Sequence, residues 1–350
     1  MLPIFDERPW GVRDLRPVYT KVVNQPIGES WLTWEDNRVA NGPLAGQSLA
    51  DLARQYRREL VGTLACYDNR FPLLVKFLFP GDKLSVQVHP DDEQAKKDGY
   101  PCGKTECWYV LRAEPGAQVA LGLKPGTTLD DFRHAIEQTR AEELLNWVDV
   151  FAGDMLYVAA GTVHTIGGGM VLVETQQTSD TTYRMYDYGR GRELHLEEGL
   201  AATKLHTNAG KVVGGAVSGQ GSADRSQASA DLQVRVHADK NGNEPALAGD
   251  TVLVRSPFFQ VEKIKLSGLF QAQTTPASPH IVVAVSGAGV MESQGMEPIT
   301  FGTGDAVVIP ACVGAYRIRP QWELEIMRMS LPASDTPEPQ TALPQSTAAR

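Results

Sequence analysis

The feature that most constrains the fold of this chain is a succession of short apolar runs separated by Gly, Pro and Asp. Runs such as LLVKFLF (73–79), AQVALGL (117–123) and MVLVETQQ (170–177) are rich in Val, Leu and other residues found in strands. The residues between them favour turns. Strands at this spacing predict a mainly β protein built as an antiparallel sandwich or barrel, rather than from alternating βαβ units. Further runs of this kind cover residues 83–89, 107–113, 154–160, 252–266, 280–293, 304–318 and 323–331.

Two segments in the first half have helical spacing instead. In residues 47–62, apolar side chains recur at intervals of three and four positions, which predicts an amphipathic helix. In residues 127–148, Thr128 can cap a helix whose stripe begins with Leu129 and Phe132. We expect this second segment to form a small helical insert between two strands of a barrel.

The length of the chain and its composition divide it into parts. A chain of 350 residues suggests two domains. Residues 218–233 are rich in Ser, Gly, Ala and Gln, which is typical of a flexible connection. We therefore expect an N-terminal domain over residues 1–208, a C-terminal barrel over 209–332 and a disordered Pro/Ser/Thr-rich tail over 333–350.

Charge and cysteine usage exclude several classes of protein. The formal net charge of −9 disfavours a general binder of nucleic acid or of an anionic membrane. A small anionic ligand would need a local basic pocket. The first ten residues carry charges where a signal peptide needs an apolar stretch, and no run reaches transmembrane length. The four cysteines lack a CxxC pair and are expected to be reduced thiols of a cytoplasmic protein: Cys66, Cys102, Cys107 and Cys312.

One short pattern occurs twice in the chain. GDMLYVAAGTVHTI begins at Gly153, and GDAVVIPACVGAYRI begins at Gly304. Each opens with Gly-Asp, continues as an apolar strand and turns at small residues. Eleven positions after its glycine the first copy has His164, whereas the second has Ala315. We therefore expect one structural unit used twice, with a possible ligand in the first copy only and a metal-free second barrel.

The first copy resembles the second sequence motif of the cupins, a Gly, a five-residue strand and Pro-x-Gly-x-x-His, with Ala159 in place of the Pro. Upstream, GDKLSVQVH resembles the first cupin motif, in which a Gly and five residues precede His-x-His. Gln87 takes the first His position here, and Glu106 in GKTECWYV takes the position of that motif's acid. Cupins are jelly-roll β-barrels, so the resemblance implies two such barrels with a metal inside the first.

Strand geometry supports a metal site at these residues. Side chains two apart on a strand point to the same face, so Gln87 and His89 lie together. Glu106 and His164 would join them inside the barrel, giving two nitrogen and two oxygen ligands. Zn²⁺ accepts such a mixed set and can keep a water or substrate as a further ligand. Taken singly, a strand histidine is more often a packed or surface residue, so the combination carries this prediction. We expect solvent-exposed or local structural roles for the other histidines: His134, His195, His206, His237 and His280.

Longer blocks of sequence resemble the type I mannose-6-phosphate isomerases of the short bacterial kind. The resemblance extends from RPWG near the N-terminus to about residue 205, and the second half shares only the barrel pattern. One departure is GESWLTWEDNRV, which continues differently from the family's usual sequence after GESW. The blocks that carry the resemblance are RPWG, GESW, NGPLAG, KFLFPGDKLSVQVHPDDE, GKTECWYVL, GTVHTIGGGMVLVETQQTSDTTYRMYDYGR and RELHLEEGL.

The resemblance implies roles for particular residues. It implies an essential active-site arginine at Arg184, a proton-transfer lysine at Lys104 and an assisting acid at Asp180. It implies substrate-phosphate contacts at Ser85 and Lys76. It also implies one Zn²⁺ per chain, bound by four ligands: Gln87, His89, Glu106 and His164.

The implied activity is the interconversion of mannose 6-phosphate and fructose 6-phosphate through an enediolate. Such an isomerisation needs a base and positive charge near the oxyanion. Zinc-bound hydroxide and Lys104 both stay open as the base, because a lysine beside a dication should have a lowered pKa. Arg184 can stabilise the enediolate or clamp an anionic group; the plain alternative is a surface salt bridge with Asp187.

Two other functions remain open at this point: a non-catalytic sugar-phosphate-binding cupin and a cupin metalloenzyme of another class, such as an oxygenase. The partner implied by the resemblance is a phosphorylated hexose, with no nucleic acid and no membrane. The chain is expected to be a monomer or a homodimer.

Overall fold

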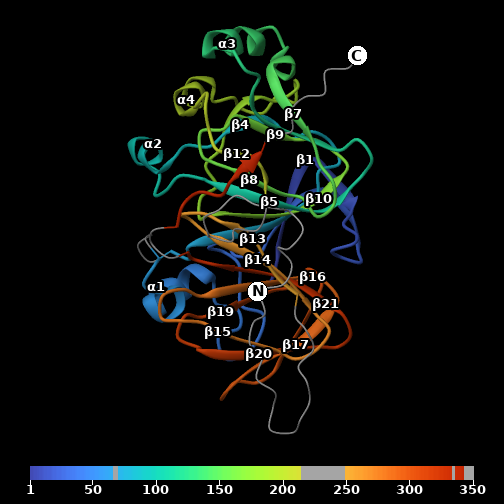
Figure 1. Cartoon of the computed structure of the whole chain (residues 1–350), viewed down its shortest axis with the longest axis vertical. Helices are drawn as coiled ribbons and strands as arrows, with labels where there is room; N and C mark the ends of the chain where they lie inside the picture. The colour runs from blue at the N-terminus through green and yellow to red at the C-terminus, as the bar shows by residue number, and fades with distance from the viewer. Residues whose placement is uncertain (66–69, 214–248, 333–335, 343–350) are drawn as a thin grey trace, which may run out of the picture.

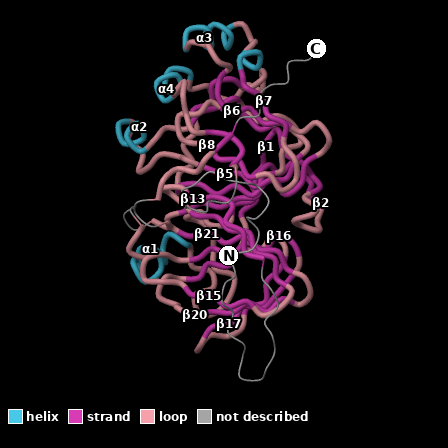
Figure 2. Tube along the Cα trace, viewed as in Figure 1, coloured by secondary structure: helices cyan, strands magenta, loops and turns pink. Residues whose placement is uncertain are grey.

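The structure, a computed structural model, describes residues 1–65, 70–213, 249–332 and 336–342. The expected flexible connection at 218–233 lies outside these ranges. The described chain is an elongated body of stacked sheets with a few short helices at its periphery (Figures 1 and 2). The expectation of a mainly β fold is confirmed, and every strand pair in the described residues is antiparallel.

The first half of the chain supplies two sheets, which we call the inner and outer N-terminal sheets. In the strand orders that follow, neighbouring strands are hydrogen-bonded to each other. The inner sheet runs β1 (Ile4–Asp14), β2 (Val22–Trp31), β3 (Leu73–Leu78), β10 (Met170–Gln177), β5 (Glu106–Ala113), β8 (Met155–Val158), β12 (Ala209–Val212) and β22 (Thr341–Ala342). The outer sheet runs β11 (Tyr183–Tyr186), β4 (Val86–Val88), β9 (His164–Ile166), β6 (Gln118–Leu123) and β7 (Leu145–Asp149).

The second half of the chain supplies a similar pair, the inner and outer C-terminal sheets. The inner sheet runs β13 (Gly249–Arg255), β14 (Gln260–Leu266), β21 (Leu324–Ser330), β16 (His280–Ser286) and β19 (Ala306–Ile309). The outer sheet runs β15 (Phe270–Gln273), β20 (Ala315–Pro320), β17 (Ala288–Ser293) and β18 (Ile299–Gly302). The closure of each pair into a jelly-roll barrel stays a prediction.

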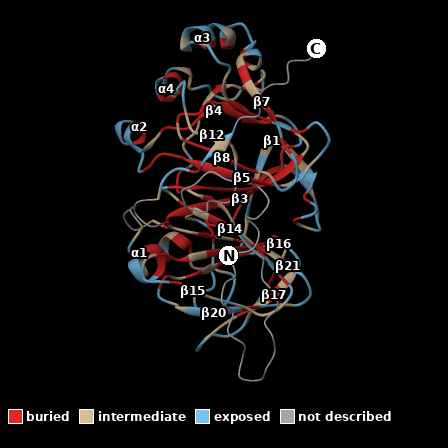
Figure 3. Cartoon of the chain, viewed as in Figure 1, coloured by how far each residue is buried: buried red, intermediate tan, exposed pale blue. Residues whose placement is uncertain are grey.

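The two inner sheets pack against each other, so both are buried on two faces (Figure 3). Strand alternation explains how one strand serves two cores. On β10, Leu172 packs between the two N-terminal sheets, while its neighbour Val173 packs against the C-terminal half. On β16, Val282 and Val283 divide in the same way between the C-terminal core and the contact of the inner sheets. This is why these strands are nearly continuous apolar runs rather than alternating ones.

The predicted helix at 47–62 is present as α1 (Leu49–Val61), with Ser48 as its N-cap. It does not lie with the N-terminal sheets. The backbone N–H groups of Ala311 and Cys312 donate to the carbonyls of Leu60 and Glu59, at 3.1 and 3.0 Å. Figure 1 shows this blue helix beside the orange and red strands of the C-terminal half. The helix therefore ties the two halves together.

The predicted helical insert at 127–148 is only partly helical. Thr128 caps α3 (Leu129–Glu137) as expected, with a capping box to Asp131. Thr139 then has a left-handed φ of 58°, which ends the helix, and a 3₁₀ turn (Ala141–Leu144) follows. Leu145–Asp149 is strand β7 and pairs with β6, so the end of the insert was wrongly predicted as helix. The apolar residues of this segment have the spacing of one face of a helix, but Trp147 and Val148 are also common in strands.

Other elements depart from the expected organisation. The hairpin β1–β2 and the short helices α2 (Asp92–Lys97) and α4 (Leu196–Ala202) were not predicted. The segment β12 begins just after the expected domain boundary at residue 208, yet it pairs with β8 of the inner N-terminal sheet. Residues 341–342, inside the tail expected to be disordered, form β22 and pair with β12. In the part of the chain that the structure describes, no helix is long and apolar enough to cross a membrane.

Candidate metal centre and substrate cavity

The two N-terminal sheets enclose a cavity of about 310 Å³. Its walls come from β1, β2, β3, β5 and β10 on the inner side and from β4, β9 and β11 on the outer side. Its lining includes Gln87, Lys104, Glu106 and Arg184. These four residues, which were singled out in the sequence, line one cavity although they are up to ninety-seven positions apart in the chain.

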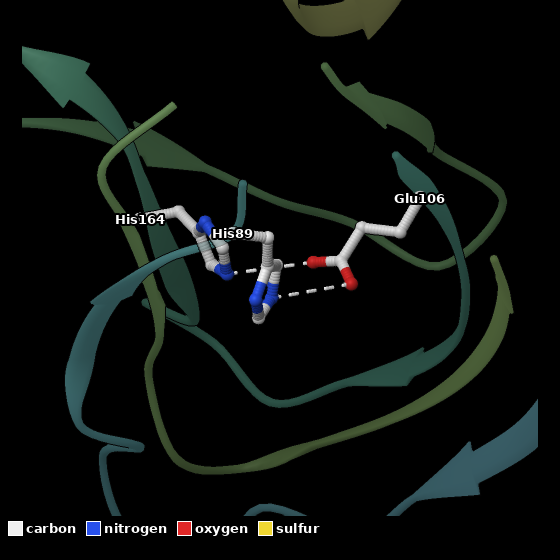
Figure 4. Close-up of side chains that lie close together, drawn as sticks. All are labelled: His89, Glu106 and His164. Carbon is white, nitrogen blue, oxygen red and sulfur yellow. Dashed lines mark ion pairs between the residues drawn. The ribbon is translucent and has the colours of Figure 1, made fainter. Parts of the chain in front are cut away.

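Two histidines and a glutamate form a buried cluster beside this cavity (Figure 4). His89 directly follows β4, while Glu106 and His164 are the first residues of β5 and β9. Their side chains are at most 2% exposed. Nε2 of His89 lies 3.6 Å from Oε2 of Glu106, and Nε2 of His164 lies 3.4 Å from Oε1. The candidate ligand atoms all lie within 4.8 Å of one another, which suits a single metal ion.

The chemistry of the cluster fits a cation. Nε2 of His89 and Oε2 of Glu106 are buried without a hydrogen-bond partner among the described residues. Buried polar atoms in this state are costly, and a bound cation would satisfy both. Nδ1 of His89 lies 2.9 Å from the carbonyl of Thr181, and Nδ1 of His164 lies 2.9 Å from that of Thr162. We assign the ring protons to Nδ1, which directs each Nε2 lone pair to the cluster.

Both imidazoles favour the neutral form that a metal ligand needs. Burial, and then the charge of Lys104, holds the pKa of His89 well below its usual value. Burial lowers the pKa of His164 to about 4. Neither ring therefore has to lose a proton near neutral pH before it can bind a cation.

Gln87 lies at the cluster, although its amide nitrogen faces the neighbouring ligand. It is paired in register with His164 across β4 and β9, and Nε2 lies 3.2 Å from Nε2 of His164. The hydroxyl of Ser85 donates to Oε1 of Gln87 at 3.1 Å. A half-turn of the amide would exchange its two ends and present Oε1 to the cluster. Ser85 and Gln87, two positions apart, therefore lie on one face.

Lys104 and Lys76 are both buried, and carboxylates surround them. Nζ of Lys104 lies 3.3 Å from Oε2 of Glu106. Nζ of Lys76 lies 3.4 Å from Glu29 and 3.6 Å from each of Glu174 and Asp180. Burial alone would lower the pKa of Lys76, but the carboxylates, led by Glu29, raise it above its usual value. Lys76 therefore stays charged, and its three donors are matched by three carboxylates.

Glu174 is a cavity residue that the sequence reasoning missed. It lies in the middle of β10, is 4% exposed and accepts a hydrogen bond of 3.2 Å from Nε1 of Trp108. Burial, and then the charge of Glu106, raises its pKa to about 7. The available signal was a lone carboxylate inside the otherwise uncharged run MVLVETQQ. A buried charge in such a strand is rare unless it is paired or functional.

Arg184 lies on β11, directly across from Gln87 on β4. Its Nη1 donates to the carbonyl of Glu193 at 2.9 Å, and its Nε is buried without a partner among the described residues. Asp187 pairs instead with Arg190 and Arg192, so the simple salt bridge with Arg184 is not observed among the described residues. Burial, and then the neighbouring Arg192, lowers the pKa of Arg184.

His195 also lines the cavity, which departs from the minor role predicted for it. Its Nδ1 accepts from the backbone N–H of Arg184 at 3.4 Å. The acidic residues after Pro90 also make structural hydrogen bonds near the cavity. Asp91 caps α2, and Oδ1 of Asp92 accepts from the N–H of Gly103 at 2.7 Å and from Gln177 at 2.9 Å. These bonds hold the turn that leads to Lys104.

Comparisons with known proteins identify the family of this chain. The sequence profile described as "Phosphomannose isomerase type I, catalytic domain" matches residues 16–131. A mannose-6-phosphate isomerase of Streptococcus mutans is 34% identical over 329 residues, covering 91% of this chain and 93% of that protein. Mannose-6-phosphate isomerase ManA of Bacillus subtilis is 34% identical over 328 residues, covering 90% and 94%.

Solved structures of isomerases with these names have a similar fold. The crystal structure of a mannose 6-phosphate isomerase from Bacillus subtilis is similar with a TM-score of 0.74 at 27% identity, covering 94% of this chain and 98% of that chain. A mutant phosphomannose isomerase from Salmonella typhimurium shares the fold, with a TM-score of 0.67 at 15% identity over 94% of this chain and 97% of that one. Because its relatives match along nearly their whole length, this chain belongs to the type I mannose-6-phosphate isomerase family.

Proposed function

We propose that this isomerase interconverts mannose 6-phosphate and fructose 6-phosphate in the N-terminal cavity, with one Zn²⁺ held by His89, Glu106, His164 and the reversed amide of Gln87. The observation that carries the proposal is the buried cluster of two histidines and a glutamate, whose unsatisfied atoms lie beside a cavity lined by charged residues. The names of the relatives supply the substrate class. When bound, zinc would supply positive charge to the substrate oxygens on carbons 1 and 2.

Glu174 is the best-placed base for the carbon-bound proton. The reaction removes a proton from carbon 2 of the aldose and returns one to carbon 1, while a hydroxyl proton moves between the two oxygens. A base works best when its pKa lies near the working pH, and that of Glu174 is raised to about 7. Lys76, 3.6 Å from Glu174, helps to hold the carboxylate in place. This adds Glu174 to the two earlier candidates for the base, zinc-bound hydroxide and Lys104.

Lys104 is suited to move the hydroxyl proton. It is buried, lines the cavity and lies 3.3 Å from Glu106 of the metal cluster. An ammonium group there can donate a proton to one oxygen of the enediolate and recover one from the other, so that protons balance over a turnover. Asp180 contacts Lys76 and lies partly exposed at the cavity, where it assists the charge balance rather than the proton transfer.

Arg184 supplies fixed positive charge. Among the described residues, no carboxylate lies within ion-pair distance of its guanidinium, although the group lines the cavity. A guanidinium keeps its proton even when its pKa is lowered, so it can stabilise a developing oxyanion without exchanging protons. An oxygenase or a non-catalytic sensor would not require this arrangement of base, acid and cation around the metal cluster.

The proposal is tested by a coupled assay of the purified protein on mannose 6-phosphate. We expect turnover that is lost after treatment with a chelator and restored by added Zn²⁺. Parallel addition of Fe²⁺ under oxygen, with oxygen consumption measured, tests the oxygenase alternative. Absence of turnover in zinc-loaded protein would refute the proposed function, and full turnover in metal-free protein would refute the role of the metal.

A further inference from the structure

Two further arginines line the cavity beside Arg184. Arg8 comes from β1 and Arg192 from the segment after β11, and both line the cavity together with Arg184. Their side chains are 29% and 24% exposed, whereas those of the metal cluster are at most 2% exposed. The cavity therefore extends from the buried candidate metal ligands to a partly exposed end that is rich in arginine.

Arg8 and Arg192 each use Nε and Nη2 of the guanidinium for ion pairs with carboxylates. Arg8 uses Nε for Glu29, at 3.1 Å, and Nη2 for Asp6, at 2.7 Å. Arg192 uses Nε and Nη2 for the carboxylate of Asp187, at 2.8 and 2.5 Å. In the described parts of the chain, no hydrogen bond or ion pair reaches Nη1 of either residue. The carboxylates thus fix the positions of the two guanidinium groups and leave the N–H groups of Nη1 available.

The charges at this end repel one another. The positive charges of Arg192 and Arg8 both contribute to the lowered pKa of Arg184, after the larger effect of burial. Like charges held this close are unfavourable unless an anion joins them. Since Arg184 has no carboxylate partner among the described residues, the arginine end is electrostatically ready for an anion.

The two residues implied earlier as phosphate contacts are less available. Nζ of Lys76 already faces three carboxylates and is 3% exposed. The hydroxyl of Ser85 donates to Gln87, which belongs to the metal end. A phosphate at Lys76 would meet Glu174 and Asp180 at close range, and repulsion between these anions would oppose binding.

We propose that Arg8 and Arg192 recognise the phosphate group of the substrate, while Arg184, which lies across from Gln87 of the metal end, serves the reacting carbons. This inference rests on the proposed function, because the phosphorylated hexose is taken from it. The phosphate is carried on carbon 6, at the opposite end of the sugar from the reacting carbons 1 and 2. A substrate whose reacting end lies at the metal cluster therefore places its phosphate toward the other end of the cavity. Arginine forks match the geometry of phosphate oxygens better than a point charge does.

Glu29 is the positioning residue of this subsite. It is buried, and its carboxylate accepts from Nε of Arg8 at 3.1 Å and from Nε1 of Trp31 at 2.7 Å. Burial would raise its pKa, but Lys76 and Arg8 lower it to about 2, so it is ionised at every working pH. Glu29 thereby connects Arg8 to Lys76, which in turn contacts the proposed base Glu174.

The test compares Arg8→Gln with Arg13→Gln, a matched change at an exposed arginine on the same strand. We expect Arg8→Gln to raise KM for mannose 6-phosphate about 10- to 100-fold, with kcat within about threefold of wild type. The inhibition constant of inorganic phosphate should rise in parallel, and Arg8→Lys should restore part of the loss. Arg13→Gln should change none of these values. A fall in kcat with unchanged KM and unchanged phosphate inhibition would overturn the subsite.

Calorimetric binding of mannitol 6-phosphate separates this inference from the proposed function, because it needs no turnover. If the wild-type protein binds this compound at least tenfold more tightly than Arg8→Gln but does not isomerise mannose 6-phosphate, the subsite stands and the proposed function fails. If the wild type isomerises the sugar and Arg8→Gln binds mannitol 6-phosphate equally tightly, the subsite fails and the function stands. Arg192→Gln provides a second variant, with circular dichroism as the check that it folds.

Discussion

The two halves of the molecule contain the same turn and use it differently. Before β8 and before β19, a Gly-Asp pair closes the turn, with glycine φ angles of 96° and 91°. Oδ2 of Asp154 accepts from the N–H of Phe151 at 2.8 Å, and Oδ2 of Asp305 accepts from that of Gly302 at 2.9 Å. The repeated sequence pattern is therefore explained by a structural need, since the turn fits both halves and serves no chemistry in itself.

What differs is the strand that follows. His164 begins β9 and is 1% exposed at the metal cluster, whereas Ala315 begins β20 and is exposed on the outer sheet. The interior of the C-terminal pair is filled by apolar side chains such as Phe301, Ile318 and Ile326. Apolar side chains therefore fill the space between the C-terminal sheets, and this fold does not need a metal site to be packed. We infer that the N-terminal site is a function added to the shared fold.

The buried polar groups of the two halves support this distinction. In the C-terminal half, Nε of Arg328 donates to Glu262 at 2.7 Å, and Nδ1 of His280 lies 2.9 Å from the hydroxyl of Tyr316. Around the N-terminal cavity, by contrast, Nε2 of His89, Oε2 of Glu106 and Nε of Arg184 lack hydrogen-bond partners among the described residues, although Lys104 forms an ion pair with Glu106. Paired groups stabilise a fold, whereas unpaired groups at a cavity indicate that a ligand completes them.

The largest effect is expected from making the first unit like the second. His164→Ala removes one ligand, so we expect loss of the bound metal and a fall in turnover of about a thousandfold or more. Metal content is measured by mass spectrometry and turnover by the coupled assay. The matched control is Ala315→Ser, an exposed change that should alter neither value. Full metal occupancy with normal turnover in His164→Ala would remove this residue from the site.

A smaller effect is expected from a change that leaves the metal cluster intact. Arg184→Ala should lower kcat about 100- to 1000-fold, because the fixed charge that stabilises the oxyanion is lost. The metal content should stay at the wild-type value, since Arg184 contributes no ligand. Unchanged turnover would contradict the role of Arg184, and loss of metal would show that it supports the cluster instead.

The base is tested by the pH profile. Glu174 has its pKa raised to about 7 and must be ionised to accept a proton, so kcat should rise with pH through about 7 and then level off. Glu174→Gln should lose this rise and fall about a hundredfold at neutral pH. A Glu174→Gln profile that keeps the same rise would transfer the role of base to Lys104 or to zinc-bound hydroxide.

The smallest effect is expected in the C-terminal half and concerns stability. Burial, and then Arg328, lowers the pKa of His280 to about 4, below its ordinary value of 6.5. The folded state therefore favours the neutral ring, so this contribution is complete above about pH 6.5 and is lost as the pH falls toward 4. His280→Gln should reduce the acid sensitivity of urea unfolding by about 1–3 kcal/mol, with turnover at neutral pH unchanged. The exposed His134→Gln is the control, and equal acid sensitivity in the two variants would contradict the prediction.

Much of the fold was predictable because buried strands leave a clear pattern. The runs at 106–113, 118–123 and 170–177 are strands β5, β6 and β10 almost as expected. The strand β7 was not predicted, since its few apolar residues match a helix and a strand equally well. The hairpin β1–β2 was missed because it is largely exposed and polar, and only its pairing with β3 reveals its role.

The site was predictable to the extent that its residues occur in short motifs. Gln87 lies on β4 and His89 directly follows it, and Glu106 and His164 begin strands that follow β4 in the chain. Other cavity residues lie in blocks that carry the family resemblance, RPWG, GESW and RELHLEEGL, but the resemblance implied no role for them, and only tertiary packing shows that they line the cavity. These are Arg8, Glu29, Arg192 and His195.

The most direct test of the account is a metal titration of the whole chain. Metal-stripped protein is titrated with Zn²⁺ while bound metal and isomerisation of mannose 6-phosphate are measured together. We predict that activity rises in proportion to bound zinc and saturates at one ion per chain, because the candidate ligand set found among the described residues lies in the N-terminal unit. Full activity before any zinc is bound, or saturation only at two ions per chain, would contradict it.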